Sequence, residues 1–372
     1  MDIEAKWIDR TVDLEQALET LDAGPLAVDT EADSLHHYPE KVCLIQLSFG
    51  GSDYLVDPLA GIDLDPLARV LADPGILKIL HGADYDLRML NRGFGMTFAG
   101  LFDTMIAARF LGETKFGLAA LLEANFGVVM DKRFQRADWS LRPLTAEMAR
   151  YASMDTHYLA GLHETLHRRL TELGRLSWAE EEFERLEAIR AAPAQTADEG
   201  FRRVKGGGRL ERNKLAVLRE LWALRETYAR KLDRPPFRVF HDDRLIELCE
   251  RSPTSVGDLA GIQRLPRPWR DGRRARELVE AVRRGLDVPR EEWPTRSRSG
   301  RSRVPVKSTS PRLEEIKRRR DRAAGSLGLE PALLGPRALL EQIAEEMDEG
   351  RDPSSLQGLR GWQWELLGEP AE

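Results

Sequence analysis

The sequence predicts an α/β domain followed by two all-α helical modules, on the strength of three observations. Short strand-like runs alternate with helical patterns over the first 190 residues. Beyond residue 210 the apolar spacing is helical throughout. Two joins of low helix propensity, rich in Gly, Arg, Ser or Pro, interrupt the chain. We therefore expect an α/β domain over 1–190, a linker over 191–209, a helical domain over 210–286, a charged linker over 287–311 and a second helical domain over 312–372.

Four apolar runs in the first domain have the length of buried strands. The first three, 26–29, 43–49 and 54–57, follow one another closely enough to form a meander, and the fourth is 76–81. Helical patterns occupy 64–71, 84–91, 104–111 and 118–126, and a longer one runs from 145 to about 173. This alternation favours a mixed sheet flanked by helices.

The two helical segments have the pattern of a repeated module. Residues 225–248 align without gaps on 320–343, and the pentapeptide "DLAGI" at 258–262 is similar to "SLQGL" at 355–359. Pro236 then falls on Pro331, and Leu245 on Leu340. The match is consistent in pattern and weak residue by residue, so the alternative is a coincidence of two helical periodicities.

The composition excludes several classes of protein. A hydrophobic content of 42% and a charged content of 32% are typical of a globular domain with a charged surface. No apolar run approaches the roughly 18 residues of a membrane span, and the N-terminus lacks the pattern of a secretory signal. Cys43 and Cys249 lie far apart in apolar patterns, so we expect buried thiols and a cytoplasmic location.

The net charge of −6 argues against a protein that coats nucleic acid along its whole length. Arginine clusters accumulate after residue 200, however, while acids dominate the first part of the chain. Local binding of nucleic acid is compatible with that separation of charge.

Acidic side chains stand at three places in the α/β domain. Asp29 and Glu31 end a strand-like run one residue apart, so both point to the same face. Asp86 lies in the first turn of a helical pattern, and Tyr151 and Asp155 are four apart on another helix and share a face. Taken singly, each place has an ordinary structural interpretation. Asp29 and Glu31 would be a solvated strand end, Asp86 a helix cap, and Tyr151 a half-buried tyrosine beside a surface acid.

Taken together, the four acids predict a metal site. Carboxylates gathered in one small domain repel one another unless cations neutralise them. Oxygen ligands with no accompanying Cys or His pattern suit Mg²⁺ or Mn²⁺. Two such ions can activate a water and stabilise the leaving oxygen in phosphodiester hydrolysis, and a tyrosine hydroxyl can orient that water.

This arrangement resembles the DEDD superfamily of 3′–5′ exonucleases, whose three motifs occur here in order. They are "DTE" at 29–31, "HGADYDLRML" at 81–90 and "YASMD" at 151–155. The Y-x-x-x-D form of the third motif implies the tyrosine subtype. The histidine subtype would place a histidine five residues before Asp155, where this chain has Arg150.

The resemblance extends to the ribonuclease D family. The segments "GLFDTMIAARFLG", "FGLAALLEANFG" and "DKRFQRADWSLRPL" are similar to its connecting segments, and the helical repeats resemble HRDC domains. The family implies a ribonuclease H-like mixed sheet and metal-dependent removal of 3′ nucleotides from RNA, especially tRNA precursors, with release of nucleoside 5′-monophosphates. It implies that two Mg or Mn ions are held by Asp29, Glu31, Asp86 and Asp155 and that Tyr151 orients the attacking water. We expect a monomer without membrane contact.

Three neighbouring polar residues receive structural interpretations. The spacing H-G-A-x-x-D of the second motif selects Asp86, which leaves Asp84 as a helix cap. Asp103 is interpreted as structural, and His81 as a histidine at the end of a strand.

The segment at 131–144 offers side chains for a single-stranded RNA end. Such a site needs cations along the backbone and flat side chains against the bases. Its place before the third motif makes it a candidate rim of the site, through Lys132, Arg133, Gln135, Arg136, Trp139 and Arg142. The alternative is a surface loop anchored in the core by Trp139.

The sequence favours three alternative functions less than it favours an exoribonuclease. A DNA 3′-exonuclease uses the same metal chemistry and differs in recognition of the 2′-hydroxyl. The HRDC-like modules and the similarity along the whole chain favour RNA. The presence of all five motif residues disfavours a non-catalytic binding adaptor, and the lack of a G-x-x-x-x-G-K-[ST] loop disfavours a helicase.

Overall fold

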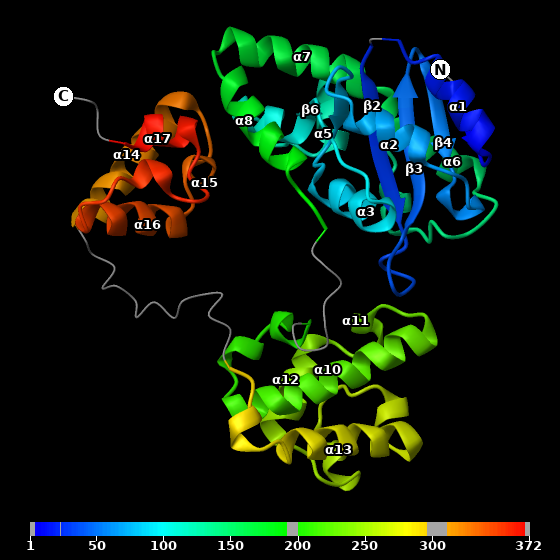
Figure 1. Cartoon of the computed structure of the whole chain (residues 1–372), viewed down its shortest axis with the longest axis vertical. Helices are drawn as coiled ribbons and strands as arrows, with labels where there is room; N and C mark the ends of the chain where they lie inside the picture. The colour runs from blue at the N-terminus through cyan, green and yellow to red at the C-terminus, as the bar shows by residue number, and fades with distance from the viewer. Residues whose placement is uncertain (1–3, 23, 192–199, 296–310, 369–372) are drawn as a thin grey trace. The chain divides into compact units, whose positions relative to one another are not determined.

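The computed structural model describes residues 4–22, 24–191, 200–295 and 311–368 (Figure 1). The chain forms two compact units. The first comprises Met1–Glu31, Val42–Ala191 and Val304–Glu372, and the second comprises Ala32–Lys41 and Ala192–Arg303. Most of the two expected linkers, at 192–199 and 296–310, lies outside the described residues.

A six-stranded mixed sheet with the order β1-β4-β3-β2-β5-β6 forms the centre of the first unit. Its strands are β1 (Lys6–Ile8), β2 (Leu26–Ala32), β3 (Val42–Phe49), β4 (Ser52–Val56), β5 (Lys78–Leu80) and β6 (Leu101–Asp103). β3 and β4 are antiparallel, whereas β1–β4, β2–β5 and β5–β6 are parallel pairs. The predicted fold class is confirmed. β1 and β6 were not predicted, because each has three residues and is not part of a longer apolar run, whereas the three residues of β5 lie within the apolar run 76–81.

Helices flank this sheet. They are α1 (Thr11–Glu19), α2 (Asp65–Ala72), α3 (Asp84–Phe94), α4 (Thr104–Phe110), α5 (Leu118–Phe126), α6 (Ala146–His157), α7 (Leu159–Glu172) and α8 (Leu176–Glu187). Every residue of β3 is buried, as expected for a strand covered on both faces. α6 packs on β3 and β4, α7 on β5 and α8 on β6.

The single helix expected over 145–173 is two helices. α6 begins where predicted, since the Thr145 hydroxyl caps it by accepting from the Met148 N–H at 3.2 Å. It ends at His157, and α7 begins at Leu159. Tyr158 separates them with φ −96° and ψ −3°, at the edge of the right-handed helical region, and it is neither a glycine nor a proline that would signal the break in the sequence.

The second unit is built on α10 (Arg212–Leu232), α11 (Pro236–Val239), α12 (Asp242–Arg251) and α13 (Gly272–Leu286). α10 and α13 run side by side (Figure 1). Their approach is so close that a Cβ on Gly285 would lie 2.4 Å from Val217 Cα. Glycine is therefore required at this helix crossing. Trp269 lies in the apolar core of the unit, as its apolar pattern indicates.

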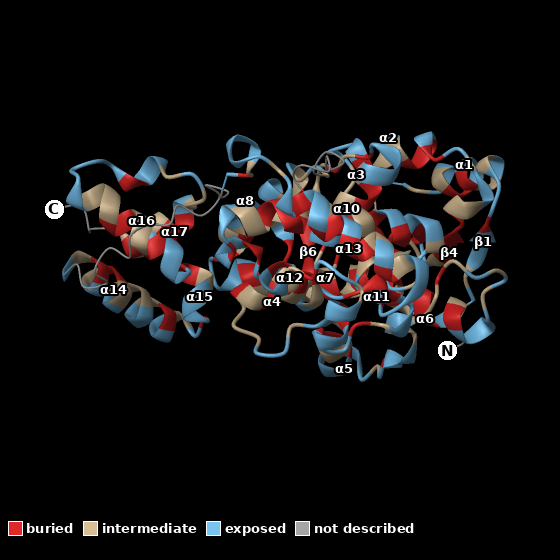
Figure 2. Ribbon diagram, turned by 90° about the horizontal axis from the view of Figure 1, so that it is seen from below, coloured by how far each residue is buried: buried red, intermediate tan, exposed pale blue. Residues whose placement is uncertain are grey.

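The last helices are α14 (Pro311–Leu327), α15 (Pro331–Leu334), α16 (Arg337–Asp348) and α17 (Gly361–Leu367). In Figure 2, α14 and α16 carry both buried and exposed residues, as amphipathic helices around a small core do. The aligned prolines Pro236 and Pro331 each start a four-residue helix, and Leu245 and Leu340 are buried in the helix that follows. Within the described residues, no helix combines the length and the apolar character needed to span a bilayer.

The helix crossing leads to a stability prediction. Gly285→Ala should lower the free energy of unfolding by about 1–3 kcal/mol, because the added methyl group overlaps the α10 backbone. Gly325→Ala is the matched control, since Gly325 is also helical and its added Cβ has no neighbour within 4 Å. That variant should be neutral or up to about 1 kcal/mol more stable. Urea unfolding followed by circular dichroism measures both, and equal effects would contradict the close packing.

Candidate active site

The first two acids lie where β2 extends past its neighbour. β5 pairs with β2 opposite Leu26 and Ala27, and Asp29 and Glu31 follow this paired stretch. Asp29 lines a cavity of about 370 Å³ that also receives Tyr151 and Asp155. The end of β2 therefore brings Asp29 to a cavity in the α/β fold, and Glu31 follows two residues later on the same strand.

Asp86 is held against β2 by a contact that sequence analysis missed. The hydroxyl of Thr30 donates a hydrogen bond to Asp86 Oδ1 at 2.5 Å. Both residues are buried, and Thr30 is the middle residue of the "DTE" motif. The motif thus contributes a donor that fixes a third acid in addition to its own two acids. Only its position between the two acids marks Thr30 in the sequence.

The start of α3 depends on Asp103. This carboxylate accepts from the backbone N–H of Gly82 and Ala83 at 3.1 and 2.8 Å, and from Met105 N–H at 2.8 Å. It therefore anchors the beginnings of α3 and α4 together, consistent with a structural role. The expectation that Asp84 caps α3 is wrong. Its carboxylate makes no cap hydrogen bond and is paired with Arg88 Nε at 2.7 Å.

Tyr151 and Asp155 come from α6, and both are at most 8% exposed. A polar network on β3 and β4 holds the next turn of this helix. Ser48 Oγ donates to Asp53 Oδ1 at 2.5 Å and lies 2.7 Å from Thr156 Oγ1, while His157 Nδ1 lies 2.7 Å from Asp53 Oδ2. The residues that follow Asp155 are therefore fixed to the sheet, and this fixes the position of the third motif relative to the sheet.

Burial and mutual repulsion raise the pKa of all four acids. Burial is the largest cause in each case. It raises the pKa of Glu31 to about 9, of Asp155 to about 8 and of Asp86 to about 7. The pKa of Asp29 is well above its usual value, and repulsion by the three other acids adds to the effect of burial. The four carboxylates therefore share one electrostatic environment.

This donor set fits hard divalent cations. Carboxylate oxygens are the preferred ligands of Mg²⁺ and Mn²⁺, and a cation favours the charged form that burial disfavours. Across the described ranges, no three acids, histidines or cysteines are already drawn together around one point as in a formed metal site. Asp29 and Asp155 line the cavity, and charge repulsion links them to Glu31 and Asp86, so these four acids are the candidate ligands.

The predicted rim separates into two groups. Lys132 and Gln135, on the short 3₁₀ helix η2 (Lys132–Arg136), line the cavity. Arg133 and Arg136 are exposed on the same element, and Arg133 is paired with Asp131 at 2.6 Å. Residues from the start of α5 complete the wall.

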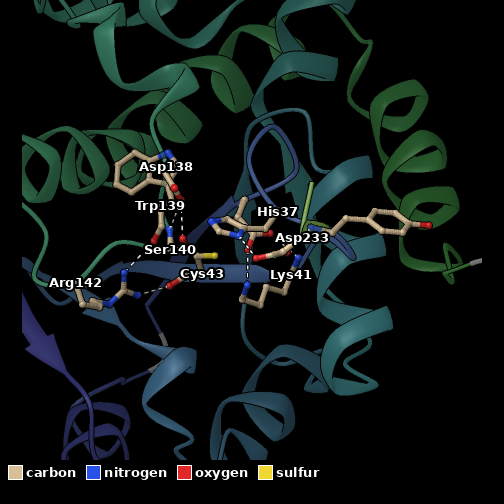
Figure 3. A network of polar contacts seen from close by, with 10 residues as sticks. His37, Lys41, Cys43, Asp138, Trp139, Ser140, Arg142 and Asp233 are labelled. Atoms are coloured by element: carbon tan, nitrogen blue, oxygen red, sulfur yellow. Dashed lines mark hydrogen bonds and ion pairs between the residues drawn. The ribbon is translucent and has the colours of Figure 1, made fainter. Parts of the chain in front are cut away.

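Trp139 and Arg142 serve the fold. Trp139 is 1% exposed, so its ring belongs to the core, as the alternative reading anticipates. The guanidinium of Arg142 binds Asp57 through two hydrogen bonds of 2.7 Å. It also donates to the Cys43 carbonyl at 2.6 Å (Figure 3). A planar guanidinium engaged in this way is saturated by protein acceptors. Because both side chains are engaged within the fold, we do not propose either as a substrate contact.

Comparison with known proteins gives a consistent result. A family model described as "3'-5' exonuclease" matches residues 5–171, and an HRDC domain model matches 214–282. Ribonuclease D of Pseudomonas paraeruginosa is 33% identical over 98% of this chain and 96% of its own length. Ribonuclease D of Jannaschia sp. is 33% identical over 93% of this chain and 88% of its own. The crystal structure of Escherichia coli RNase D, whose title describes an exoribonuclease involved in structured RNA processing, matches with a TM-score of 0.72 and 26% identity. That match covers 98% of this chain and 96% of the other.

The raised pKa values predict an unusual pH dependence of stability. A carboxyl whose pKa is higher in the folded state stabilises the fold below its unfolded pKa of about 4, and this stabilisation is lost as pH rises through its folded pKa. Without divalent cations, the melting temperature should therefore fall between pH 5 and pH 9, and Mg²⁺ should reverse most of the fall. Calorimetry in EDTA and in Mg²⁺ measures this.

Two variants on α3 make this test specific. Asp86→Asn should weaken the pH dependence, since it removes one of the repelling acids. Asp84→Asn should leave it unchanged, because the Arg88 pair lowers the pKa of Asp84. Identical pH profiles for the two variants would contradict the electrostatic account.

Proposed function

The chain belongs to the ribonuclease D family of 3′–5′ exoribonucleases, and from this premise we propose that it trims the 3′ ends of RNA such as tRNA precursors by two-metal hydrolysis. The exonucleases of this superfamily are in general metal-dependent. The observation that carries the proposal is a set of four mutually repelling carboxylates, two of which, Asp29 and Asp155, line one cavity beside a buried tyrosine. The released products would be nucleoside 5′-monophosphates.

Asp29, Glu31, Asp86 and Asp155 would hold two Mg²⁺ or Mn²⁺ ions. When bound, these ions supply a water of lowered pKa and neutralise the charge that develops on the phosphate. Thr30 keeps Asp86 oriented toward the other acids through its 2.5 Å hydrogen bond. The hydrogen-bond network around Asp53 fixes the position of Asp155 relative to the sheet. The protein thus fixes its acids before substrate arrives, which reduces reorganisation during the reaction.

Tyr151 orients the attacking water in this proposal. Burial and the neighbouring acids raise the pKa of its phenol above the usual value of 10, so the hydroxyl stays protonated at neutral pH. It therefore acts as a hydrogen-bond partner of the water and not as a general base. Lys132 and Gln135 face the same cavity and supply an ammonium and an amide to the RNA backbone.

The helical modules increase the hold on long substrates in this proposal. The HRDC match covers α10 to α13, and exposed arginines such as Arg267 and Arg276 lie within it. Several weak phosphate contacts tethered to a nuclease raise the effective affinity for RNA. A monomeric state and a cytoplasmic location belong to the same proposal, and two buried cysteine side chains suit a reducing compartment.

Digestion of 5′-labelled RNA and of DNA with the same sequence tests this function. With Mg²⁺, the full chain should shorten the RNA stepwise from its 3′ end, and EDTA should stop the reaction. Asp86→Asn should lower the rate at least about 100-fold, because a cation ligand is lost. Asp84→Asn, two residues away on the same helix turn, should retain activity, since Asp84 is exposed and paired with Arg88.

Three results would overturn the proposal. Cleavage that survives EDTA would exclude two-metal hydrolysis. Preferential digestion of DNA would show that DNA, and not RNA, is the preferred substrate. Equal losses in Asp84→Asn and Asp86→Asn would remove the special role of the buried acid.

A further inference from the structure

One histidine on the wall of the cavity has no part in the reaction described above. His81 follows β5 and lines the cavity together with Asp29, Tyr151 and Asp155. It is the first residue of the second motif, five positions before Asp86. Its ring is half-buried.

Hydrogen bonding within the fold fixes the tautomer of this histidine. The hydroxyl of Thr104 has a single proton, which it donates to the Leu80 carbonyl at 3.0 Å. The Thr104 oxygen lies 2.9 Å from His81 Nδ1 and is therefore the acceptor in that contact. His81 consequently carries its proton on Nδ1, and its Nε2 has a lone pair. This assignment follows from the hydrogen-bond pattern and not from an observed hydrogen position.

His81 lines the cavity, and Thr104 engages only its Nδ1. Among the described residues, none forms a hydrogen bond with Nε2, and Nε2 is absent from the set of fully buried polar atoms without a partner. Nε2 is therefore at least partly accessible and available to accept a hydrogen bond from a molecule in the cavity. Thr104 is completely buried at the start of α4, so the ring is held at its other nitrogen by a rigid partner.

The imidazole is neutral at physiological pH. Burial lowers its pKa below the usual 6.5, and the nearby Asp103 carboxylate only partly opposes this effect. The cavity therefore presents a neutral ring nitrogen that only accepts, whereas its other neutral polar groups, the Gln135 amide and the Tyr151 hydroxyl, also carry donors. The carboxylates there are assigned to cations, and the ammonium of Lys132 can only donate.

We propose that His81 is a specificity-determining residue, whose Nε2 accepts a hydrogen bond from a hydroxyl of the 3′-terminal ribose. The inference rests on the proposed function, since it takes an RNA end to be the occupant of the cavity. A ribose hydroxyl is the neutral donor that every terminal nucleotide carries, whatever its base. A site built around such a donor disfavours the analogue that lacks it, because the acceptor is left unpaired.

Three oligonucleotides of one sequence test this inference. The first is all-ribose, the second has a 2′-deoxy terminal nucleotide and the third a 3′-deoxy terminal nucleotide. For the wild-type enzyme, loss of the recognised hydroxyl should lower kcat/KM for the first cleavage about 3- to 10-fold. The substrate that loses rate identifies whether the 2′- or the 3′-hydroxyl is recognised.

Variants of His81 assign that discrimination to its ring. His81→Phe keeps the ring shape without an acceptor, and His81→Asn keeps a polar partner for Thr104 that is too short to reach the cavity. Both variants should lower kcat/KM for the all-ribose substrate about 3- to 10-fold and should cleave all three substrates at the same rate. Once the histidine is gone, removing the hydroxyl that it bound should have no further effect, as a double-mutant cycle requires. His81→Gln can place an amide oxygen near the Nε2 position and should restore part of the preference.

The outcomes separate this inference from the proposed function. If the wild-type enzyme hydrolyses RNA but the Phe and Asn variants keep its full preference, the role of His81 is overturned and the function stands. A wild-type enzyme that treats all three RNAs alike also overturns it. If no RNA is hydrolysed, the proposed function and this inference fall together.

Discussion

Mutual repulsion among four acids is the interaction on which the site depends. Asp29, Glu31, Asp86 and Asp155 share one poorly solvated environment, and each is harder to ionise there than in water. A fold that places like charges together gives up stability unless something of opposite charge binds. In the proposed function, divalent cations would relieve this repulsion, so the unfavourable arrangement would itself favour their binding. The same charges would make a poor binding surface for bare RNA phosphate.

The surrounding fold holds the acids in this unfavourable arrangement. Each acid-bearing element is fixed by neutral or opposite partners outside the cluster. Thr30 ties Asp86 to β2, Asp103 joins the starts of α3 and α4, and Asp53 holds α6 to the sheet. The same beginning of α4 fixes the ring of His81 through Thr104, so one structural junction orients both the start of α3, which carries Asp86, and the proposed ribose contact.

Much of this was accessible from the sequence because it depends on local spacing. Alternation along a strand and the turn of a helix each relate residues within one element, so the three motifs, the fold class and the family were recognised. The fold class and the family are confirmed, and the roles of the motif residues stay a prediction. Contacts between distant segments were not accessible. Thr30 meets Asp86 across 56 positions and Arg142 meets Asp57 across 85, so no local period reports them. Arg142 was therefore interpreted as a substrate contact although its charge serves the core.

The most direct test of the central claim is diffraction from crystals soaked in Mn²⁺, measured at the manganese absorption edge. The account predicts two anomalous peaks, about 3.5–4 Å apart, among Asp29, Glu31, Asp86 and Asp155. It also predicts that the peaks are lost or reduced in Asp86→Asn and kept in Asp84→Asn. Manganese bound elsewhere in the wild-type protein, with none among these four acids, would contradict the account.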